Sequence, residues 1–177
     1  RLASGIAGCR AARIVSVKSE LLMDGYWPAD VFKVPFLVRR AGRHNGDDFE
    51  KIETPEALRA FAAGFPGSDL YLMDYIDYSS ADGHFRKYRF FGIDGEILPY
   101  HLAIGSHWKV HHVSTDMANQ GWMQREEEAF LEAPETVFDE RQMGALRALT
   151  QSVALDYMGI DCALDQNGNV IVFEANA

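Results

Sequence analysis

The fold of this chain is decided by the stretch Gly159-Ile160-Asp161-Cys162-Ala163-Leu164-Asp165-Gln166-Asn167-Gly168-Asn169-Val170-Ile171-Val172-Phe173-Glu174-Ala175-Asn176-Ala177. Two apolar segments in it, 160–164 and 170–173, flank the polar sequence Asp165-Gln166-Asn167-Gly168. Asn-Gly is a strong hairpin signal, because both residues adopt positive φ at low cost. We therefore predict a β-hairpin that turns at these four residues.

Three side chains with oxygen atoms lie at the open end of this predicted hairpin. Asp161 comes level with Glu174 and Asn176, and the last two point to one face because they are two residues apart. Burying two carboxylates side by side is costly, and a divalent cation such as Mg²⁺ removes that cost by binding their oxygens. The alternative is that the carboxylates lie at solvated strand ends, and the spacing alone leaves both interpretations open.

The spacing of Asp161 from Glu174-Ala175-Asn176, with an apolar hairpin between them, resembles the metal-binding signature of ATP-grasp enzymes. That superfamily includes the D-alanine–D-alanine ligases, the glutathione synthetases and the ribosomal-protein glutamate ligases. The resemblance implies that Asp161, Glu174 and Asn176 hold Mg²⁺ or Mn²⁺ ions, which bind the phosphates of ATP. It also implies an α+β fold of two subdomains with antiparallel sheets, the N-terminal domain of the family being missing from this chain.

The same resemblance implies how the chain is divided. Residues 34–76 are expected to form the small lid subdomain of an ATP-grasp fold. Residues 77–177 are expected to form the large subdomain that binds metal and nucleotide, truncated at its C-terminus. Residues 1–33 are expected to be a linker, the remnant of a preceding region.

Composition limits the classes of partner. With 177 residues, 47% of them hydrophobic, the chain can bury a substantial core. A net charge of −9 argues against a nucleic-acid partner, because binding phosphates requires basic patches. The two cysteines provide no disulfide framework, and no segment approaches the roughly 20 apolar residues of a membrane helix. We expect a cytoplasmic protein without nucleic-acid or membrane partners, and homo-oligomer formation stays open.

Turn signals and hydrophobic periodicity predict the other elements. Thr54-Pro55-Glu56 is typical of a helix N-terminus. Asp139, with Gln142 three residues later, is typical of a capping box, and the apolar stripe of the helix that follows runs to Tyr157. A further helix is predicted over 124–131, and the predicted strands are 11–17, 34–39, 49–52, 70–76, 85–93 and 96–102.

A loop with two glycines and several basic side chains separates strands 34–39 and 49–52. Glycines let the backbone approach phosphates, and exposed N–H groups with cations attract oxyanions, although a plain hairpin loop with solvated charges has the same composition. Beside the C-terminal signature, the loop resembles the ATP-grasp lid, with Arg39 in place of the usual phosphate-contacting lysine. The nucleotide-binding residues that the resemblance implies here are Arg39, Gly42, Arg43, His44 and Gly46.

The strand 70–76 has the position of the strand that runs into the hinge of ATP-grasp folds. In that family, backbone groups of the hinge read the adenine edge, and a nearby acid meets the ribose. The resemblance implies Met73, Asp74 and Ile76 as nucleotide-binding hinge residues, and Asp77 or Asp82 as the acid for the ribose.

Arg86, Lys87 and Arg89 lie among aromatic residues in the strand 85–93. They fit solvated edge charges, but the resemblance assigns basic residues of this strand to the triphosphate or to an acyl phosphate. Arg89 aligns best with such a catalytic position. Phosphoryl transfer requires fixed positive charge of this kind, which offsets the charge on the transferred group.

The second catalytic candidate is Lys109, in the segment 105–120. It fits a substrate-facing loop in which a lysine or histidine contacts an acidic acceptor, and a structural loop fits equally well. His107, His111 and His112 also raise the alternative of a zinc site, but no cysteine is near and the spacing does not match such sites.

The resemblance implies an ATP- and Mg²⁺-dependent ligase. ATP phosphorylates a substrate carboxylate, and an amine or similar nucleophile then displaces the phosphate to form an amide-type bond. Two alternatives stay open: a kinase of the same fold, and a catalytically inactive module that binds nucleotide or serves in assembly. Arg39 in place of lysine and the missing domain favour the inactive module, whereas the intact set of Asp161, Glu174 and Asn176 opposes it.

Overall fold

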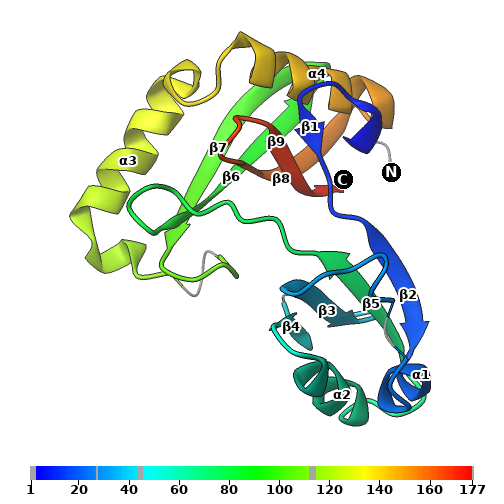
Figure 1. Ribbon diagram of the computed structural model, residues 1–177. Helices are drawn as coiled ribbons and strands as arrows, with labels where there is room; N and C mark the ends of the chain where they lie inside the picture. The colour runs from blue at the N-terminus through cyan, green and yellow to red at the C-terminus, as the bar shows by residue number, and fades with distance from the viewer. Residues whose placement is uncertain (1–2, 27, 44–45, 112–114, 177) are drawn as a thin grey trace. The chain divides into compact units, whose positions relative to one another are not determined.

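The computed structural model describes residues 3–26, 28–43, 46–111 and 115–176, which form two compact units (Figure 1). The smaller unit comprises residues 12–76, and the larger unit comprises residues 1–11 together with 77–177. Residues 1–33 therefore do not form the linker that we expected. Leu22 and Phe32 are buried in the core of the smaller unit, because this segment supplies apolar side chains that its sheet needs to cover one face.

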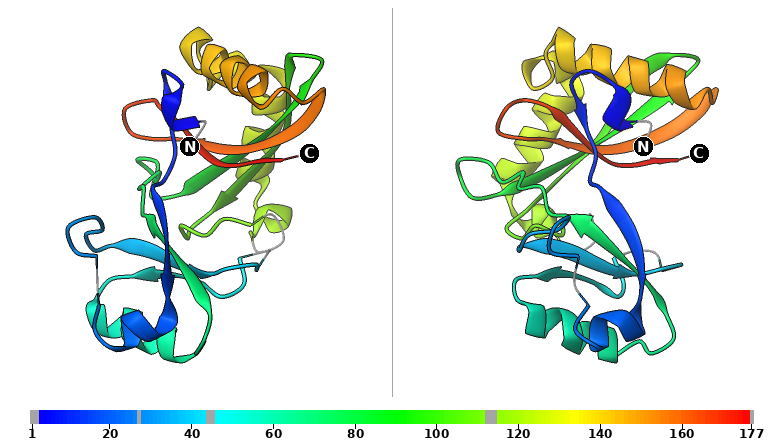
Figure 2. Two further views of the ribbon diagram at one scale, coloured as in Figure 1. Left: turned by 90° about the vertical axis from the view of Figure 1, so that its right-hand side faces the viewer. Right: turned by 45° about the vertical axis from the view of Figure 1, so that its right-hand side comes forward.

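The smaller unit is a four-stranded antiparallel sheet with two helices packed against it (Figure 2). Its elements are β2 (Ile14–Lys18), α1 (Ser19–Met23), β3 (Phe36–Arg40), β4 (Phe49–Ile52), α2 (Pro55–Ala63) and β5 (Asp69–Asp74). The strand order is β2-β5-β3-β4, so β5 lies inside the sheet and pairs on both sides.

Helix α2 begins where the sequence predicts. The side-chain oxygen of Thr54 accepts a hydrogen bond from the backbone N–H of Ala57, and Pro55 is the first helical residue. Phe61 and Ala62 from this helix are buried in the core. The predicted strand 49–52 is confirmed residue for residue, whereas β5 ends at Asp74, two residues before its predicted end.

The larger unit is a five-stranded sheet with the helices α3 and α4 on one face (Figures 1 and 2). Its elements are η1 (Ala3–Gly5), β1 (Cys9–Arg10), β6 (Phe85–Ile93), β7 (Glu96–Gly105), η3 (Met117–Asn119), α3 (Gly121–Glu132), η4 (Pro134–Thr136), α4 (Glu140–Val153), β8 (Tyr157–Leu164) and β9 (Val170–Asn176). The strand order is β1-β9-β8-β6-β7, and β1 is parallel to β9 whereas the other neighbours are antiparallel. Both hairpins predicted from the sequence are confirmed.

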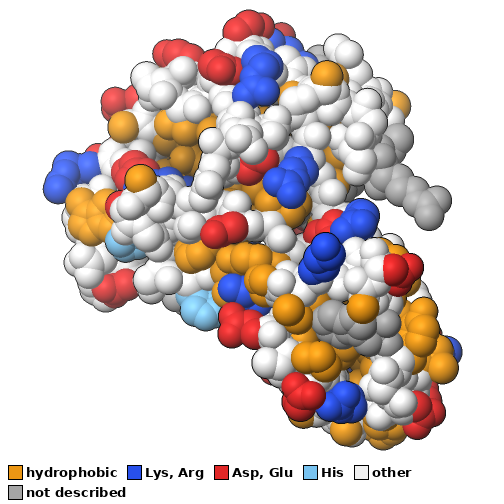
Figure 3. Space-filling view, in the orientation of Figure 1, with side chains coloured by type: hydrophobic (Ala, Val, Ile, Leu, Met, Phe, Trp, Pro, Cys, Tyr) orange, Lys and Arg blue, Asp and Glu red, His pale blue; other side chains and the backbone are white. Residues whose placement is uncertain are grey.

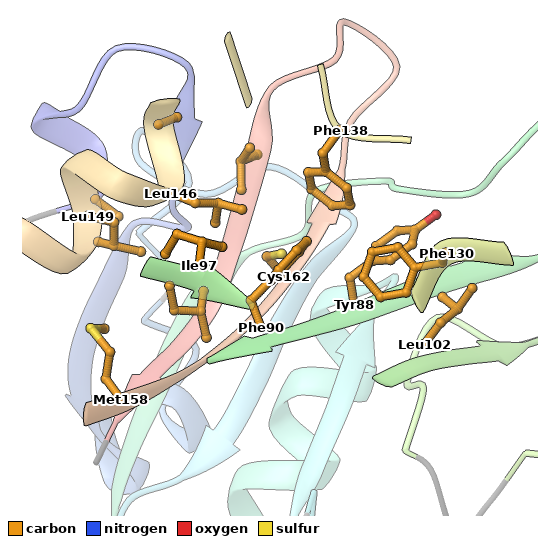
Figure 4. Packing of buried hydrophobic residues seen from close by; sticks show 14 of the residues in the cluster. Tyr88, Phe90, Ile97, Leu102, Phe130, Phe138, Leu146, Leu149, Met158 and Cys162 are labelled. Carbon is orange, nitrogen blue, oxygen red and sulfur yellow. The ribbon is translucent and has the colours of Figure 1, made fainter. Parts of the chain in front are cut away.

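The core of the larger unit lies between this sheet and its helices. Tyr88 and Phe90 of β6 point into it and pack edge-on against Phe130 and Phe138, with ring centroids 4.9 to 5.4 Å apart. Figure 4 shows the rings of Tyr88, Phe130 and Phe138 at one end of this cluster and the leucines of α4 at the other. Because side chains alternate along a strand, the intervening residues of β6, including two cations, point to the face away from the helices.

Helix α4 begins with the predicted capping box but ends earlier than predicted. Asp139 accepts a hydrogen bond from the backbone N–H of Gln142 at 3.0 Å, and the Gln142 side chain accepts one from the backbone N–H of Asp139 at 2.7 Å. The helix ends at Val153, where Ala154 adopts a left-handed conformation with φ of 56°. Tyr157, which we expected on the helical stripe, instead begins β8.

The turn of the β8–β9 hairpin differs in detail from the prediction. Gly168 has a positive φ of 71°, whereas Asn167 does not, so the turn is not the tight Asn-Gly type. The Asp165 carboxylate organises it: Oδ1 accepts hydrogen bonds from the backbone N–H groups of Asn167, at 2.9 Å, and Asn169, at 2.8 Å. The aspartate therefore sets this turn, with glycine at the position that requires positive φ.

Charged side chains of both signs are interspersed over the face of the molecule in Figure 3. Within the described ranges, the structure has no helix that is both long and apolar enough to cross a membrane.

Candidate functional site

A β-bulge in β9 determines which face of the larger sheet Glu174 occupies. Near the turn, β8 and β9 pair regularly, with Cys162 opposite Val172. A regular continuation would put Phe173 opposite Asp161 and turn Glu174 toward the core, since a shift of one residue reverses the face. Instead, Phe173 is the extra residue of the bulge and Glu174 lies opposite Asp161. The bulge thus brings both carboxylates to the face away from the helices.

The carboxylate of Asp161 lies between two cations of β6. Nζ of Lys87 is 3.1 Å from Oδ2, and Nη1 of Arg89 is 3.3 Å from Oδ1. Arg89 is directly opposite Asp161 in the pairing of β6 with β8, and the Asp161 side chain is 12% exposed. Two positive charges therefore compensate this carboxylate, while Glu174 on the neighbouring strand is exposed.

Arg89 lies over Gly159, where a side chain would obstruct it. A Cβ added to Gly159 would be 2.8 Å from Nη2 of Arg89. The guanidinium also lies 5.7 Å from the ring centroid of Phe91. Its Nε is buried and, within the part of the chain that the structure describes, has no hydrogen-bond partner. The contact with Asp161 therefore leaves a donor of Arg89 unsatisfied, and 37% of the Arg89 side chain is exposed.

The third predicted metal ligand, Asn176, lies opposite Gly159 on the same face as Glu174. In residues 3–26, 28–43, 46–111 and 115–176, no group of three His, Cys, Asp or Glu side chains converges as a metal site. Mg²⁺ is commonly held by one or two carboxylates, with substrate phosphates completing its coordination. The facing carboxylates of Asp161 and Glu174, with the amide of Asn176 beside them, fit such a partial site of hard oxygen donors.

The smaller sheet also has a face away from its helices, and Arg39 lies on it. Arg39 is opposite Phe49 of β4 and Tyr71 of β5. Its guanidinium lies 5.9 Å from the Phe49 ring centroid and donates a hydrogen bond to the backbone carbonyl of Arg43. Arg39 is therefore held against the glycine loop.

Lys51 is a second cation on this face, which the sequence analysis missed. It lies opposite Leu37, two residues from Arg39 along β3, and its Nζ is 4.2 Å from the ring centroid of Tyr75. The alternation of side chains along the strand could have predicted this position. Ile52 is fully buried, so its neighbour Lys51 must point to the opposite face.

In the glycine loop between β3 and β4, one basic side chain forms an ion pair with an acidic side chain of the same loop. Gly42 and Gly46 have positive φ angles of 74° and 76°, which glycine adopts without strain. Nε of Arg43 lies 3.3 Å from Oδ2 of Asp48, so this cation is partly neutralised. His44, also a predicted nucleotide contact, lies outside the described residues.

The predicted hinge residues fall into two groups. Met73 is opposite Ile14 of β2 and Leu37 of β3, and Asp74 forms two side-chain hydrogen bonds of 2.8 Å with Arg13. Backbone pairing on both sides of β5 argues against direct reading of a base edge by Met73 or Asp74. Ile76 lies beyond the ladders, so it retains the predicted position.

Asp82, the predicted ribose acid, is bound within its own loop. Its oxygens accept hydrogen bonds from Nη1 and Nη2 of Arg86, at 3.0 and 2.9 Å, and from the backbone N–H of His84, at 3.0 Å. The hydrogen bonds from Arg86 hold the pKa of Asp82 well below its usual range. Arg86 also binds Glu126 of α3. These contacts tie the loop to the helix and argue against a ribose contact by Asp82.

Lys109 lies in the exposed segment that follows β7, where it lines a pocket of the larger unit together with His107 and Trp122. Arg89, the other predicted catalytic residue, lies in the middle of β6 instead. His107 and His111 take part in no group of three metal-binding side chains within the described ranges, and His112 lies outside them. The zinc alternative therefore gains no support.

The sequence analysis assigned no role at this site to two features, the side chain of Lys87 and the β-bulge at Phe173. Lys87 fitted an edge charge, although its position two residues before Arg89 already indicates the same face. The bulge at Phe173 had no local signal, because counting back from the turn pairs that residue with Asp161. Only the requirement that the two carboxylates face each other indicates it.

Comparison with known proteins identifies the fold. No protein-family description matches the sequence, and no curated protein matches it. Solved structures match nearly the whole chain. N5-carboxyaminoimidazole synthetase from Staphylococcus aureus, complexed with ADP, has a TM-score of 0.55 and 16% identity, over 98% of this chain and 41% of that chain. VanG D-Ala:D-Ser ligase from Enterococcus faecalis has a TM-score of 0.53 and 13% identity, over 99% and 49%. L-amino acid ligase from Bacillus licheniformis has a TM-score of 0.53 and 9% identity, over 96% and 36%.

The chain spans less than half of the length of each of these proteins. All three are ATP-grasp ligases, and at such low identity the likeness concerns the fold. The predicted α+β fold is confirmed in the two units, each with an antiparallel or mainly antiparallel sheet and helices on one face. The chain therefore has the ATP-grasp fold.

Proposed function

We propose that the chain provides the nucleotide- and metal-binding part of an ATP-dependent ligase, which activates a substrate carboxylate as an acyl phosphate and joins it to an amine or similar nucleophile. The observation that carries this proposal is the bulge at Phe173, which brings Glu174 opposite Asp161. The bulge leaves Phe173 itself 44% exposed, an arrangement that favours the site rather than packing. The ADP complex of the synthetase with the same fold supports nucleotide binding.

Asp161, Glu174 and Asn176 would hold Mg²⁺, with Mn²⁺ as a substitute of similar ligand preference. The metal would supply positive charge to the phosphate oxygens of ATP. Asp161 and Glu174 provide anionic oxygens from adjacent strands, so their spacing is fixed by the ladder rather than by a flexible loop.

Lys87 and Arg89 would stabilise the negative charge that moves from ATP to the carboxylate. Both project from β6 on the carboxylate face, and the side chain of Arg89 is 37% exposed, so its guanidinium can meet an incoming oxygen. Fixed cations of this kind lower the barrier to phosphoryl transfer, because they need no rearrangement as charge develops. No side-chain nucleophile is required.

Arg39 and Lys51 of the smaller unit would contact phosphates, together with the backbone at Gly42 and Gly46. The two cations share one face of the smaller sheet, and both rest on aromatic rings, although Nζ of Lys51 also lies 3.6 Å from Oε1 of the exposed Glu53. Ile76 and the backbone beside it would meet the adenine.

Mg²⁺-dependent binding of ATP, measured by calorimetry, tests this proposal. We expect a micromolar dissociation constant for the parent protein in the presence of Mg²⁺ and much weaker binding in its absence. Glu174→Ala should weaken binding by about a hundredfold, or about 2.7 kcal/mol, since the variant lacks one of the two carboxylates that would hold the metal. Glu128→Ala, which removes an exposed glutamate from α3, is the matched control and should bind as the parent does.

Absence of binding by the parent protein at millimolar ATP would refute the proposal and leave an interaction module. If ATP binds, hydroxylamine distinguishes the two enzyme classes. Hydroxylamine traps an acyl phosphate as a hydroxamate, so a ligase supplied with its carboxylate forms hydroxamate and ADP. A kinase of the same fold, which leaves a stable phosphate ester on its acceptor, forms ADP alone.

A further inference from the structure

Three aromatic side chains form a patch on the face of the larger sheet that also presents Asp161. Phe91 lies two residues after Arg89 on β6, so the alternation of side chains puts both on this face. Tyr157 lies four residues before Asp161 on β8 and is on this face for the same reason. The rings of Phe91 and Tyr157 stack with centroids 5.2 Å apart, and the ring of Tyr100, on β7, packs edge-on against Phe91 at 4.5 Å. We call Phe91, Tyr100 and Tyr157 the aromatic patch.

A second β-bulge brings Tyr100 to the aromatic patch. The register of β6 with β7 shifts between Arg89 and Phe90, where Tyr100 is the extra residue on β7. A regular ladder would place Tyr100 opposite Phe90, whose side chain is buried in the core. Instead, the ring of Tyr100 contacts Phe91 and is exposed. Like the bulge in β9, this one turns a side chain to the carboxylate face that regular pairing would turn to the core.

The guanidinium of Arg89 connects the aromatic patch to the carboxylates. Its Cζ lies 5.7 Å from the ring centroid of Phe91, and its Nη1 lies 3.3 Å from Oδ1 of Asp161. More than a third of the Arg89 side chain is exposed, at 37%. An anionic group that meets Arg89 therefore has the facing carboxylates of Asp161 and Glu174 on one side and aromatic rings on the other.

The sheet face is covered on the far side of Arg89 and accessible on the side of the patch. On the far side, Ala103 lies opposite Lys87 and is fully buried, and Ala163 of β8, on the same face, is fully buried as well. In the other direction, Tyr100 is 58% exposed and Tyr157 is 50% exposed. A ligand that presents an anionic group to Arg89 therefore has room for its body over the aromatic patch.

The composition of this accessible surface favours a flat aromatic ligand. Aromatic rings prefer offset-stacked or edge-to-face contacts with other rings, and the exposed parts of Tyr100 and Tyr157 offer such contacts. Leu98, opposite Phe91, and Ile93, two residues further along β6, are exposed too and enlarge the apolar surface. Packing between strands accounts for the contacts among the rings, but it does not require that half of two rings stay in water. A continuous exposed apolar surface of this kind commonly marks a binding site.

We propose that the aromatic patch binds the body of a carboxylic acid with a flat aromatic ring system, whose carboxylate meets Arg89, and that this acid is a substrate of the proposed ligase. Binding of the acid stands on the patch and on Arg89, whereas its role as substrate rests on the proposed function. In that role, a carboxylate oxygen of the acid attacks the γ-phosphorus of ATP, the bond from this phosphorus to the β,γ-bridging oxygen breaks, and ADP leaves. The amine then attacks the carbonyl carbon and loses a proton, and phosphate leaves as the amide forms.

Equilibrium dialysis with 2-naphthoate tests the binding, and the fluorescence of the ligand gives the bound fraction. The protein is used without nucleotide or metal. Two counterparts compete with 2-naphthoate: 2-naphthamide, which lacks the charge, and decahydro-2-naphthoate, which lacks the aromatic rings. We expect saturable binding of 2-naphthoate and at least tenfold weaker binding of each counterpart, because one loses the charge-assisted contact and the other the ring contacts.

Substitutions in the aromatic patch locate the bound acid. Tyr100→Ala and Tyr157→Ala should each weaken binding of 2-naphthoate by about tenfold, because each removes one ring from the patch. Tyr26→Ala is the matched control, since Tyr26 is 53% exposed in the smaller unit, and it should bind as the parent does. Thermal unfolding of all three variants verifies that they fold, as expected for exposed side chains.

The proposal is overturned if 2-naphthoate does not bind up to about 10 mM, a level at which even weak fragments saturate. It is also overturned if either counterpart binds as tightly, or if both patch variants bind as the parent does. A second copy of the chain is the other candidate to cover the patch. Light scattering would then show a dimer that Tyr157→Ala dissociates, and this result too would overturn the proposal.

Calorimetry with MgATP on the same samples separates this proposal from the proposed function. Binding of MgATP without binding of 2-naphthoate would refute the acid site and leave the nucleotide site standing. Binding of 2-naphthoate without binding of MgATP would refute the ligase, and with it the role of the acid as a substrate, and leave the acid site standing.

Discussion

The two ends of the β8–β9 hairpin each hold an aspartate of low exposure, but the partners differ in kind. At the turn, the Asp165 side chain is 3% exposed and accepts hydrogen bonds mainly from backbone N–H groups and Asn169, with one further contact of 3.3 Å from Arg10. At the open end, Asp161 is compensated by the ends of two long side chains, Lys87 and Arg89. Backbone donors cannot leave without unfolding the turn, whereas long cationic side chains can move to another anion. Low exposure alone therefore does not separate a structural carboxylate from a functional one; the mobility of its partners does.

The pKa of Asp165 reflects the hydrogen-bond donors that the turn fixes around its carboxylate. Burial acts to raise the pKa of Asp165, but hydrogen bonds from Asn169 and Asn167 outweigh it, and the pKa lies below its usual value. The ionised form is therefore the one that the folded turn stabilises.

The largest effect on stability is expected for Asp165→Ala. The substitution leaves the backbone N–H groups of Asn167 and Asn169 and the guanidinium of Arg10 without their acceptor. We expect the free energy of unfolding to fall by about 2–4 kcal/mol. Urea denaturation measures this change. A loss below 0.5 kcal/mol would show that the turn does not depend on this carboxylate.

Two glycines on neighbouring strands sharpen the comparison. A Cβ on Gly92 would lie 2.5 Å from Cγ2 of the buried Thr150, so Gly92→Ala should cost about 1–3 kcal/mol by overpacking. Gly159→Ala should cost less than about 1 kcal/mol, because the clashing atom is the flexible end of Arg89.

The order reverses for nucleotide binding. Gly159→Ala displaces Arg89 from Asp161 and should weaken MgATP binding about tenfold, whereas folded Gly92→Ala should bind normally. Urea denaturation and calorimetry on both variants measure the pair of effects. If the variant with the larger loss of stability also shows the larger loss of MgATP binding, the result would contradict the proposed role of Gly159 in leaving space for Arg89.

The pH dependence of stability distinguishes the contribution of the Asp165 charge from that of its hydrogen-bond acceptors. At pH 7, Asp165→Asn should lower the free energy of unfolding by about 1–2 kcal/mol, because the amide keeps an acceptor but loses the charge. A lowered folded pKa stabilises the protein above the unfolded value of about 3.9, and this contribution disappears as pH falls through the folded value. The difference between parent and variant should therefore be constant above about pH 5 and shrink below pH 4. A difference that grows on acidification would contradict the assignment.

The smallest effect on stability is expected at Glu174. Its side chain is exposed, so Glu174→Ala should change the free energy of unfolding by less than about 0.5 kcal/mol in the absence of nucleotide and metal. Thermal unfolding with and without MgATP makes the measurement, since ligand binding stabilises the parent by mass action. A large loss of stability in the unliganded variant would assign Glu174 a structural role and count against its proposed role in binding metal and nucleotide.

Local signals in the sequence predicted most elements, and each prediction succeeded where one segment contains all of the interacting groups. Thr54 caps α2, Asp139 and Gln142 form the capping box, and the 85–102 and 160–173 hairpins form as predicted. The prediction failed where a distant segment competes. Tyr157 continues a helical period but joins the sheet, since pairing with Ile93 of β6 is available there.

By itself, the sequence indicated most of the strands and helices from residue 34 onward, but neither β1 nor α1, together with the hairpin near the C-terminus and the residue types that gather at its open end. These follow from hydrophobic periodicity and capping groups, which act between residues close in sequence. Only the tertiary structure decided that Glu174 faces Asp161, that Arg89 lies over Gly159, and that Lys87 pairs with Asp161. A bulge, a close approach and an ion pair depend on which strands become neighbours, and that choice is made by the packing of the whole unit rather than by any segment alone.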